Sequence, residues 1–155
     1  MTVLLEVKGL QKVYTTRFGG TSVTALRNVN LSVEKGEYIA IMGESGSGKT
    51  TLLNILAALD RPTRGQVLLD GNDITAISEK ELSAFRRSNL GFVFQDFNLL
   101  DTFNLKDNIF LPLVLSGKKY GEMSKRLKPL AAMLGITDIL YKYPYEVSGG
   151  QKQRA

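Results

Sequence analysis

The sequence predicts an α/β fold arranged around one glycine-rich loop, and three observations support this prediction. Residues 38–42 form a continuous apolar run, as expected for a strand that is covered on both faces. A loop rich in glycine follows at residues 43–50. From Lys49 onward, apolar side chains recur with the period of a helix. A strand, a glycine-rich loop and a helix in this order are typical of α/β proteins that bind phosphate groups at the helix N-terminus.

The composition is that of an ordinary globular protein. The chain has 155 residues, of which 43% are hydrophobic and 23% charged, and this length suffices for one domain with a hydrophobic core. Its apolar runs are too short to span a bilayer, and the N-terminus shows no charged-then-apolar signal segment. We therefore expect a cytoplasmic protein. The sequence contains no cysteine and no histidine, which excludes disulfides and histidine-based chemistry within it.

The N-terminal part is predicted to be rich in β-structure. Residues 4–14 form a strand-like run, and the glycine pair at residues 19–20 is typical of a turn between strands. Residues 29–33 then alternate between apolar and polar, which is the period of a half-buried strand. The continuous apolar run at residues 38–42 completes this β-rich start.

Helix and strand signals follow the loop in turn. The helical pattern that begins at Lys49 ends before Pro62, and residues 67–69 form a short strand that the Asp-Gly turn at residues 70–71 closes. Ser78 is a candidate N-cap, because Glu81 occupies the capping-box position. Residues 91–94 again have the composition of a buried strand.

The segment beyond these residues is predicted to be mostly helical. Apolar side chains fall at helical spacing between residues 123 and 134, and Gly135 is a natural C-cap. Pro112 and Pro129 lie inside helical patterns, so we expect each of them to kink or interrupt its helix.

Residues 43–50 fit the phosphate-loop pattern G-x-x-x-x-G-K-[ST]. Backbone N–H groups curled into a nest can converge on a triphosphate, and glycines leave the backbone open to this approach. Lys49 supplies a positive charge for the β- and γ-phosphates, and the Thr50 hydroxyl is placed to bind Mg²⁺. The loop is therefore predicted to bind a nucleoside triphosphate with Mg²⁺. The residues assigned to this site are Gly43, Ser45, Gly46, Ser47, Gly48, Lys49, Thr50 and Thr51.

Charge does not identify a partner. The formal net charge is +5, and the basic residues are scattered along the chain. Such a modest excess suits phosphate ligands, anionic membranes and nucleic acid alike. We interpret the densest group as a solvated helix face. It consists of Lys118, Lys119, Lys125, Arg126 and Lys128.

Residues 147–151 read Val-Ser-Gly-Gly-Gln and precede a basic Lys-Gln-Arg segment. Downstream of a phosphate loop, this segment resembles the LSGGQ signature of the ATP-binding-cassette (ABC) ATPases, with Val147 in place of the usual leucine. The resemblance extends over the whole chain and implies a P-loop NTPase fold with an N-terminal antiparallel β subdomain and an α-helical insertion. We assign residues 1–95 to the β subdomain and the first part of the core. Residues 96–147 form the helical subdomain, and residues 148–155 form the signature and the start of its helix.

The resemblance implies roles for further residues. Gln95 looks like the Q-loop glutamine, which contacts Mg²⁺ and the attacking water, so Gln95 and Lys49 are the catalytic candidates. Tyr14 lies where the family places an aromatic ring against adenine, although a packing aromatic at a strand end is the alternative. The signature would contact the ATP that a second subunit holds. Its residues are Ser148, Gly149, Gly150 and Gln151.

Within this family, residues 94–102, 108–113 and 143–145 look like antimicrobial-peptide (bacitracin-type) transporters, in a group with macrolide exporters and lipoprotein-releasing systems. The resemblance implies a head-to-tail dimer of ATPase subunits around two ATP molecules, with a membrane permease docked on the helical insertion and the Q-loop. The protein would then be an ABC transporter ATPase subunit at the inner face of the cell membrane. No nucleic-acid partner is expected.

The family's acidic strand motif and its γ-phosphate histidine come after the signature. Neither lies within these 155 residues, so we expect the C-terminal part of the core to be missing and the chain to bind ATP without hydrolysing it. We also expect the run at residues 38–42 to expose apolar surface and to favour aggregation or swapped dimers.

There are three alternatives to the transporter subunit. A nucleotide kinase or GTPase is disfavoured, because the guanine-specific Asn/Thr-Lys-x-Asp motif is absent and the helical insertion fits neither class. A soluble ABC ATPase acting on nucleic acid or ribosomes is also disfavoured. Such proteins usually have duplicated cassettes or a coiled-coil or zinc insertion, whereas here the insertion is modest and cysteine is absent. A nucleotide-binding fragment without activity of its own is the interpretation that we favour for these 155 residues.

Overall fold

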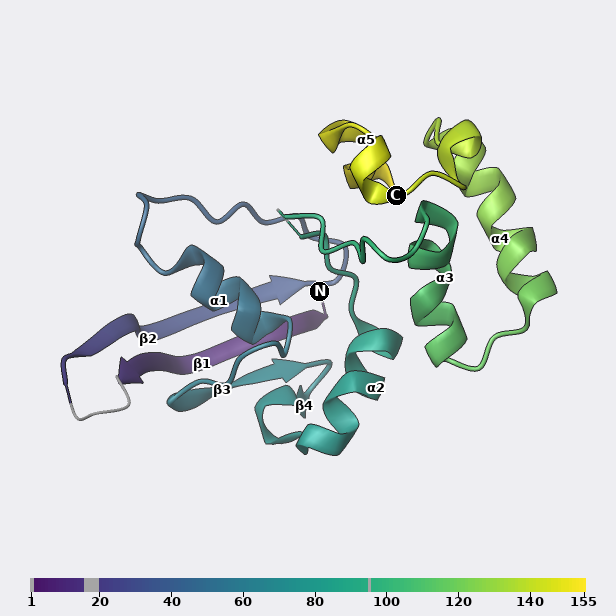
Figure 1. Cartoon of the computed structure of the whole chain (residues 1–155). Coiled ribbons are helices and arrows are strands. Elements are labelled where there is room, and N and C mark those ends of the chain that lie inside the picture. The colour runs from purple at the N-terminus through teal and green to yellow at the C-terminus, as the bar shows by residue number, and fades with distance from the viewer. Residues whose placement is uncertain (1, 16–19, 95) are drawn as a thin grey trace. The chain divides into compact units, whose positions relative to one another are not determined.

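The computed structural model describes residues 2–15, 20–94 and 96–155. The chain divides into two compact units, Met1–Leu90 and Gly91–Ala155. All strands of the described residues belong to the first unit, whereas the second contains helices and loops (Figure 1).

The first unit is built on a four-stranded antiparallel sheet with the strand order β2-β1-β3-β4. The long strand β1 (Val3–Thr15) pairs along its whole length with β2 (Ser22–Glu34). On its other side β1 pairs with β3 (Arg64–Leu69), which in turn pairs with the short β4 (Asn72–Asp73). The predicted antiparallel β-structure at the N-terminus is therefore confirmed.

Helix α1 (Lys49–Leu56) covers one face of this sheet (Figure 1). Three strands and the helix each contribute apolar side chains to the packing between them. Burial of one such side chain stabilises the fold by about 1.5–3 kcal/mol. Leu10 and Val67 of the sheet and Ile55 of the helix are almost completely buried. The core consists of Val7, Leu10, Leu26, Leu52, Ile55, Val67 and Ile74.

The chain leaves β3 through the predicted turn and then enters two helical elements, η1 (Ile74–Ala76) and α2 (Glu79–Asn89). Ser78 is the N-cap of α2, as predicted, with extended backbone angles. Its hydroxyl bonds the Glu81 carboxylate at 2.5 Å, whereas no side-chain hydrogen bond caps the backbone.

The second unit contains α3 (Leu105–Leu115), α4 (Tyr120–Met133) and α5 (Gly149–Arg154). Between α4 and α5 the chain forms the short 3₁₀ turns η2 (Thr137–Ile139) and η3 (Pro144–Glu146). The apolar pattern predicted over residues 123–134 coincides with α4. Its side chains form a separate core made of Leu105, Phe110, Met123, Leu127, Ala131, Ile136 and Ile139.

The two helix-internal prolines do not interrupt their helices. Pro112 lies inside α3 and Pro129 inside α4, and both helices continue through them. A proline removes one backbone donor, but burial of an amphipathic face supplies most of a helix's stability. Phe110 and Leu127 provide such burial next to the prolines. As predicted, Gly135 follows the end of α4 in the left-handed conformation, with φ of 63°.

Two predicted buried strands are not formed. Residues 38–42 and 91–94 have no regular secondary structure, and Tyr38, Met42 and Val93 are 94%, 88% and 80% exposed. A strand is stabilised by hydrogen bonds to a neighbouring strand. Within residues 2–15, 20–94 and 96–155 neither segment has such a neighbour, so the expected buried strands beside the loop are absent from the described sheet.

No helix in the described part of the chain has the length and the apolar character needed to cross a membrane.

Candidate nucleotide-binding site

The glycine-rich loop joins residues 38–42 to α1 in the first unit (Figure 1). Gly46 and Gly48 have φ of 82° and 90°, values that glycine adopts without steric cost. Gly48 is the N-cap of α1, and its carbonyl accepts a hydrogen bond from Leu52 N at 2.9 Å. A Cβ at Gly48 would lie 2.5 Å from the carbonyl oxygen of Ala25. The loop therefore rests directly on β2, which fixes the start of α1 against the sheet.

The side chain of Lys49 crosses back over the loop. Its Nζ donates to the carbonyl oxygens of Gly43 at 2.8 Å and Glu44 at 2.6 Å, and to Ser47 Oγ at 3.3 Å. A positive charge is thus held above the N-terminal end of α1, where the helix dipole and the free backbone N–H groups also favour anions. Both features together favour an anion at this loop.

An open pocket lies in front of the loop and is shared with the start of β2. The structure brings six of the predicted residues together in its wall. The other two, Gly43 and Ser47, both contact Lys49 and face each other, because a Cβ on Gly43 would lie 2.9 Å from Ser47 Oγ. The pocket is lined by Val23, Thr24, Ala25, Ser45, Gly46, Gly48, Lys49, Thr50 and Thr51.

The three residues from β2 were not predicted as part of the site. They reach the loop only through the fold, because strand β2 passes beneath the turn that precedes α1 and Gly48 contacts Ala25 there. Nothing in the local sequence of residues 23–25 indicates a binding role.

Tyr14 lies next to this pocket. It is the strand partner of Val23, which is one of the lining residues, and it is 43% exposed. Its hydroxyl donates to Asp60 Oδ2 at 2.8 Å, and Lys12 Nζ lies 4.8 Å from the centre of its ring. The aromatic ring is therefore held by two charged side chains, and the strand pairing with Val23 brings its backbone to the edge of the pocket.

Asp60 is the acceptor that joins these groups. Burial pushes the pKa of Asp60 upward, but hydrogen bonds from Lys12, Tyr14 and the Arg61 N–H outweigh this effect and lower the pKa below its ordinary value. Lys12 Nζ donates to Asp60 Oδ1 at 2.6 Å. The carboxylate is thus ionised at neutral pH, as a hydrogen-bond acceptor for several donors requires.

The signature residues belong to the second unit. Ser148 is the N-cap of α5, where its N–H donates to Gln151 Oε1 at 2.8 Å and its Oγ accepts from Gln151 N at 3.4 Å. This reciprocal cap defines the start of the helix and leaves Gly149 and Gly150 exposed. A Cβ on Gly149 would lie 3.6 Å from the ring of Phe97, so the aromatic segment after residue 95 packs against this helix start.

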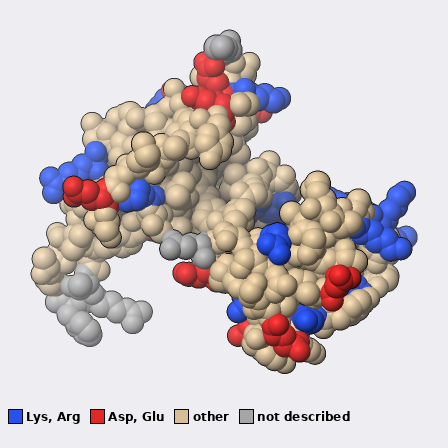
Figure 2. Space-filling view, turned by 90° about the horizontal axis from the view of Figure 1, so that it is seen from above, with Lys and Arg blue, Asp and Glu red and all other residues tan. Residues whose placement is uncertain are grey.

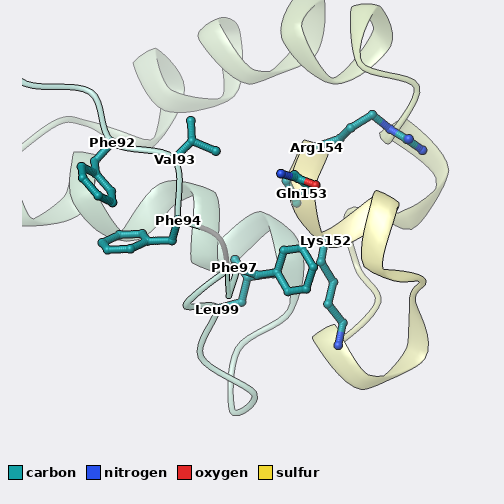
Figure 3. A pocket seen from close by; sticks show the side chains of 9 residues that line it. Phe92, Val93, Phe94, Phe97, Leu99, Lys152, Gln153 and Arg154 are labelled. Atoms are coloured by element: carbon teal, nitrogen blue, oxygen red, sulfur yellow. The ribbon is translucent and has the colours of Figure 1, made fainter. Parts of the chain in front are cut away.

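Phe97 and two aromatic residues that precede residue 95 line a pocket of the second unit (Figure 3). The rings of Phe92 and Phe94 are in contact, with their centres 4.5 Å apart. Gln95, the predicted Q-loop residue, lies outside the described residues. The pocket is lined by Phe92, Val93, Phe94, Phe97, Leu99, Lys152, Gln153, Arg154 and Ala155.

The described residues contain no cluster of three or more acidic side chains that could hold a metal ion by themselves. The Thr50 hydroxyl, however, lines the same pocket as Lys49. One hydroxyl in front of a phosphate loop suits Mg²⁺, which keeps several waters and takes further ligands from nucleotide phosphates.

A phosphate loop that opens a helix against a sheet, in a chain that also carries a capped Ser-Gly-Gly-Gln helix start, defines a nucleotide-binding domain of the ABC class. The sequence pattern of the ABC transporter family matches residues 26–155, and the chain belongs to this family.

Relatives with known names agree with this assignment. The chain is 52% identical over 152 residues to the uncharacterized ABC transporter ATP-binding protein YvcR of Bacillus subtilis, covering 98% of this chain and 59% of that protein. It is 46% identical over 152 residues to the bacitracin export ATP-binding protein BceA of Halalkalibacterium halodurans, again covering 98% and 59%. The chain thus spans 59% of the length of these two curated relatives.

A solved relative has the same fold. The ATP-binding cassette MJ0796, in a dimeric post-hydrolysis state bound to ADP and Pi, superposes with a TM-score of 0.89 at 37% sequence identity. The match covers 97% of this chain and 66% of that chain. The predicted ABC-type α/β fold is confirmed by this similarity.

Proposed function

We propose that the chain is the ATP-binding part of an ABC transporter ATPase subunit and that it holds ATP with Mg²⁺ at the loop of residues 43–51. The observation that carries this proposal is the position of Lys49. Its ammonium lies within 2.6–2.8 Å of two loop carbonyls, directly in front of the N-terminus of α1. The phosphates would bind the loop N–H groups and Lys49, and Thr50 would bind Mg²⁺.

The base of the nucleotide is assigned to Tyr14. This ring is half-exposed and adjoins Val23 at the edge of the same pocket. Stacking of adenine on an aromatic ring at this position would hold the nucleotide at the end opposite to its phosphates.

Hydrolysis is proposed for the complete subunit, with Lys49 and Gln95 as the catalytic residues. By its resemblance to the family, the acidic residues and the histidine that act on the γ-phosphate follow the signature, and these 155 residues contain no histidine. We therefore propose that the 155-residue chain binds ATP without turning it over.

The proposed partners are a second ATPase subunit and a membrane permease. Ser148, Gly149, Gly150 and Gln151 would contact the ATP of the second subunit, and the dimeric state of the related cassette MJ0796 supports this arrangement. The similarity to a bacitracin export ATP-binding protein supports a peptide-antibiotic substrate. A position at the inner face of the cell membrane follows from the proposed permease partner. Nucleic acid is not proposed as a partner, because the net charge of +5 is modest and the basic residues are scattered along the chain. On the face seen in Figure 2, acidic side chains stand among the basic ones.

Calorimetric titration with ATP and Mg²⁺, combined with a phosphate-release assay, tests these proposals. Saturable binding that Lys49→Ala weakens at least about tenfold is expected, since the substitution removes a charged phosphate partner worth about 1.5–3 kcal/mol. Phosphate release should stay at the level of buffer. Binding that is indifferent to Lys49→Ala would refute the phosphate-loop assignment. Steady release that depends on Lys49 would instead refute the proposed inactivity of the chain.

A further inference from the structure

The side chain of Asp60 joins two residues of β1 that are close to the candidate site. Both of its carboxylate oxygens are occupied, Oδ2 by the Tyr14 hydroxyl at 2.8 Å and Oδ1 by Lys12 Nζ at 2.6 Å. The backbone N–H of Arg61 also donates to Oδ1 at 2.7 Å. This cluster, Lys12, Tyr14 and Asp60, connects the end of β1 to the segment that follows α1.

The cluster restricts the aromatic ring of Tyr14 in two ways. Its hydroxyl is tied to Asp60, and one face of the ring is taken by the ammonium of Lys12 at 4.8 Å from the ring centre. The Lys12 side chain is only 12% exposed and also donates to the Arg61 carbonyl at 2.6 Å, so it is itself held in place. The face of Tyr14 opposite to Lys12 is therefore the one that a planar ligand can reach.

We propose that Lys12 and Asp60 are positioning residues, which hold the ring of Tyr14 in the orientation that receives the base of a bound nucleoside triphosphate. This inference rests on the proposed function of the loop at residues 43–51. A tyrosine that is already fixed loses little rotamer freedom when a base stacks on it, whereas a free ring must be ordered at the time of binding. The cluster should affect the base and not the phosphates, because the hydrogen bonds of Lys49 within the loop go to Gly43, Glu44 and Ser47.

Comparing two ligands tests the inference. Inorganic tripolyphosphate presents the phosphates without a base, so ATP and tripolyphosphate are titrated calorimetrically in parallel, both with Mg²⁺. Asp60→Ala is expected to weaken ATP binding about 3- to 10-fold, the loss that corresponds to ordering one side chain, and to leave tripolyphosphate binding unchanged. Tyr14→Phe keeps the ring but removes its hydroxyl, and should weaken ATP binding to a similar extent.

The double variant identifies the mechanism. If Asp60 acts through the Tyr14 hydroxyl, Tyr14→Phe combined with Asp60→Ala should bind ATP no more weakly than Asp60→Ala alone. Glu79→Gln is the matched control, because it removes a neighbouring carboxylate that pairs with Arg61 instead, and it should change neither titration.

Several results would overturn the inference. If Asp60→Ala lowered the affinity for ATP and for tripolyphosphate equally, the cluster would stabilise the fold and would not position Tyr14 for the base. Additive losses in the double variant would mean that Asp60 does not act through Tyr14. If the wild-type chain bound both ligands with the same affinity, the base would make no contact that contributes to binding. The assignment of the loop as the phosphate site would be unaffected. Failure of the wild-type chain to bind either ligand would remove the proposed function and this inference with it.

Discussion

A single methyl group added at Gly48 is expected to weaken ATP binding far more than the same change at Gly46. Both glycines have left-handed backbone angles, with φ of 90° and 82°, so alanine at either position costs about 1–2 kcal/mol of backbone strain. At Gly46 the new Cβ would meet no atom within 4 Å. The strain alone corresponds to about a 5- to 30-fold loss of affinity.

Gly48→Ala carries a second cost. Its Cβ would lie 2.5 Å from the Ala25 carbonyl oxygen and 3.0 Å from Leu26 Cδ2, so the loop or the backbone of β2 must move. Forcing extra atoms into a packed region costs about 1–3 kcal/mol more, which brings the total to about 2–5 kcal/mol. Because the loop is exposed, it can move without unfolding the core, and we expect the cost in binding rather than in stability.

Calorimetric titration of both alanine variants with ATP and Mg²⁺ checks this difference, and urea unfolding checks that the fold persists. Gly48→Ala should bind at least about fivefold more weakly than Gly46→Ala, since at least about 1 kcal/mol separates them on this argument. Equal affinities for the two variants would refute the reasoning, because they would show that the loop does not rest on β2 when the nucleotide is bound.

Two further predictions concern stability. The Asn108 side chain accepts from Leu100 N at 2.7 Å and donates to three backbone carbonyls, so Asn108→Ala should lower the free energy of unfolding by about 2–4 kcal/mol in urea titrations. Asn89→Ala removes one exposed hydrogen bond and serves as the control, with a loss of about 1 kcal/mol or less. The lowered pKa of Asp60 means that its contribution is present above the ordinary value of 3.8 and disappears as the pH falls through the lower folded-state value. The difference in unfolding free energy between wild type and Asp60→Ala should therefore shrink on acidification below pH 3.8, and a constant difference would contradict the ion pair.

The phosphate loop and α1 were predictable from the sequence because their causes are local. Glycines permit the backbone angles of the loop, and the helix that starts at Lys49 shows its apolar period within a few residues. The same is true of the start of α2, where Ser78 and Glu81 are three positions apart. The helix start at Ser148 was predicted from the resemblance of residues 147–151 to the family signature.

Features that depend on distant partners could not be predicted. Residues 38–42 and 91–94 have the composition of buried strands, yet a strand also needs a neighbour, and composition does not supply one. Asp60 lies 46 positions from Tyr14, so no local pattern indicates their hydrogen bond. The same holds for Ala25, which meets Gly48 only because β2 passes beneath the loop.

The hydrogen bonds of Lys49 determine which positively charged side chain can occupy position 49. Two carbonyl oxygens and one hydroxyl converge on a single nitrogen atom, and an ammonium group has three N–H bonds that diverge from one point. A guanidinium spreads its five donors in a flat fork and cannot address three acceptors that surround one atom. The loop therefore suits the shape of an ammonium group as well as its charge. Arginine at position 49 would carry the same charge but could not make these three hydrogen bonds.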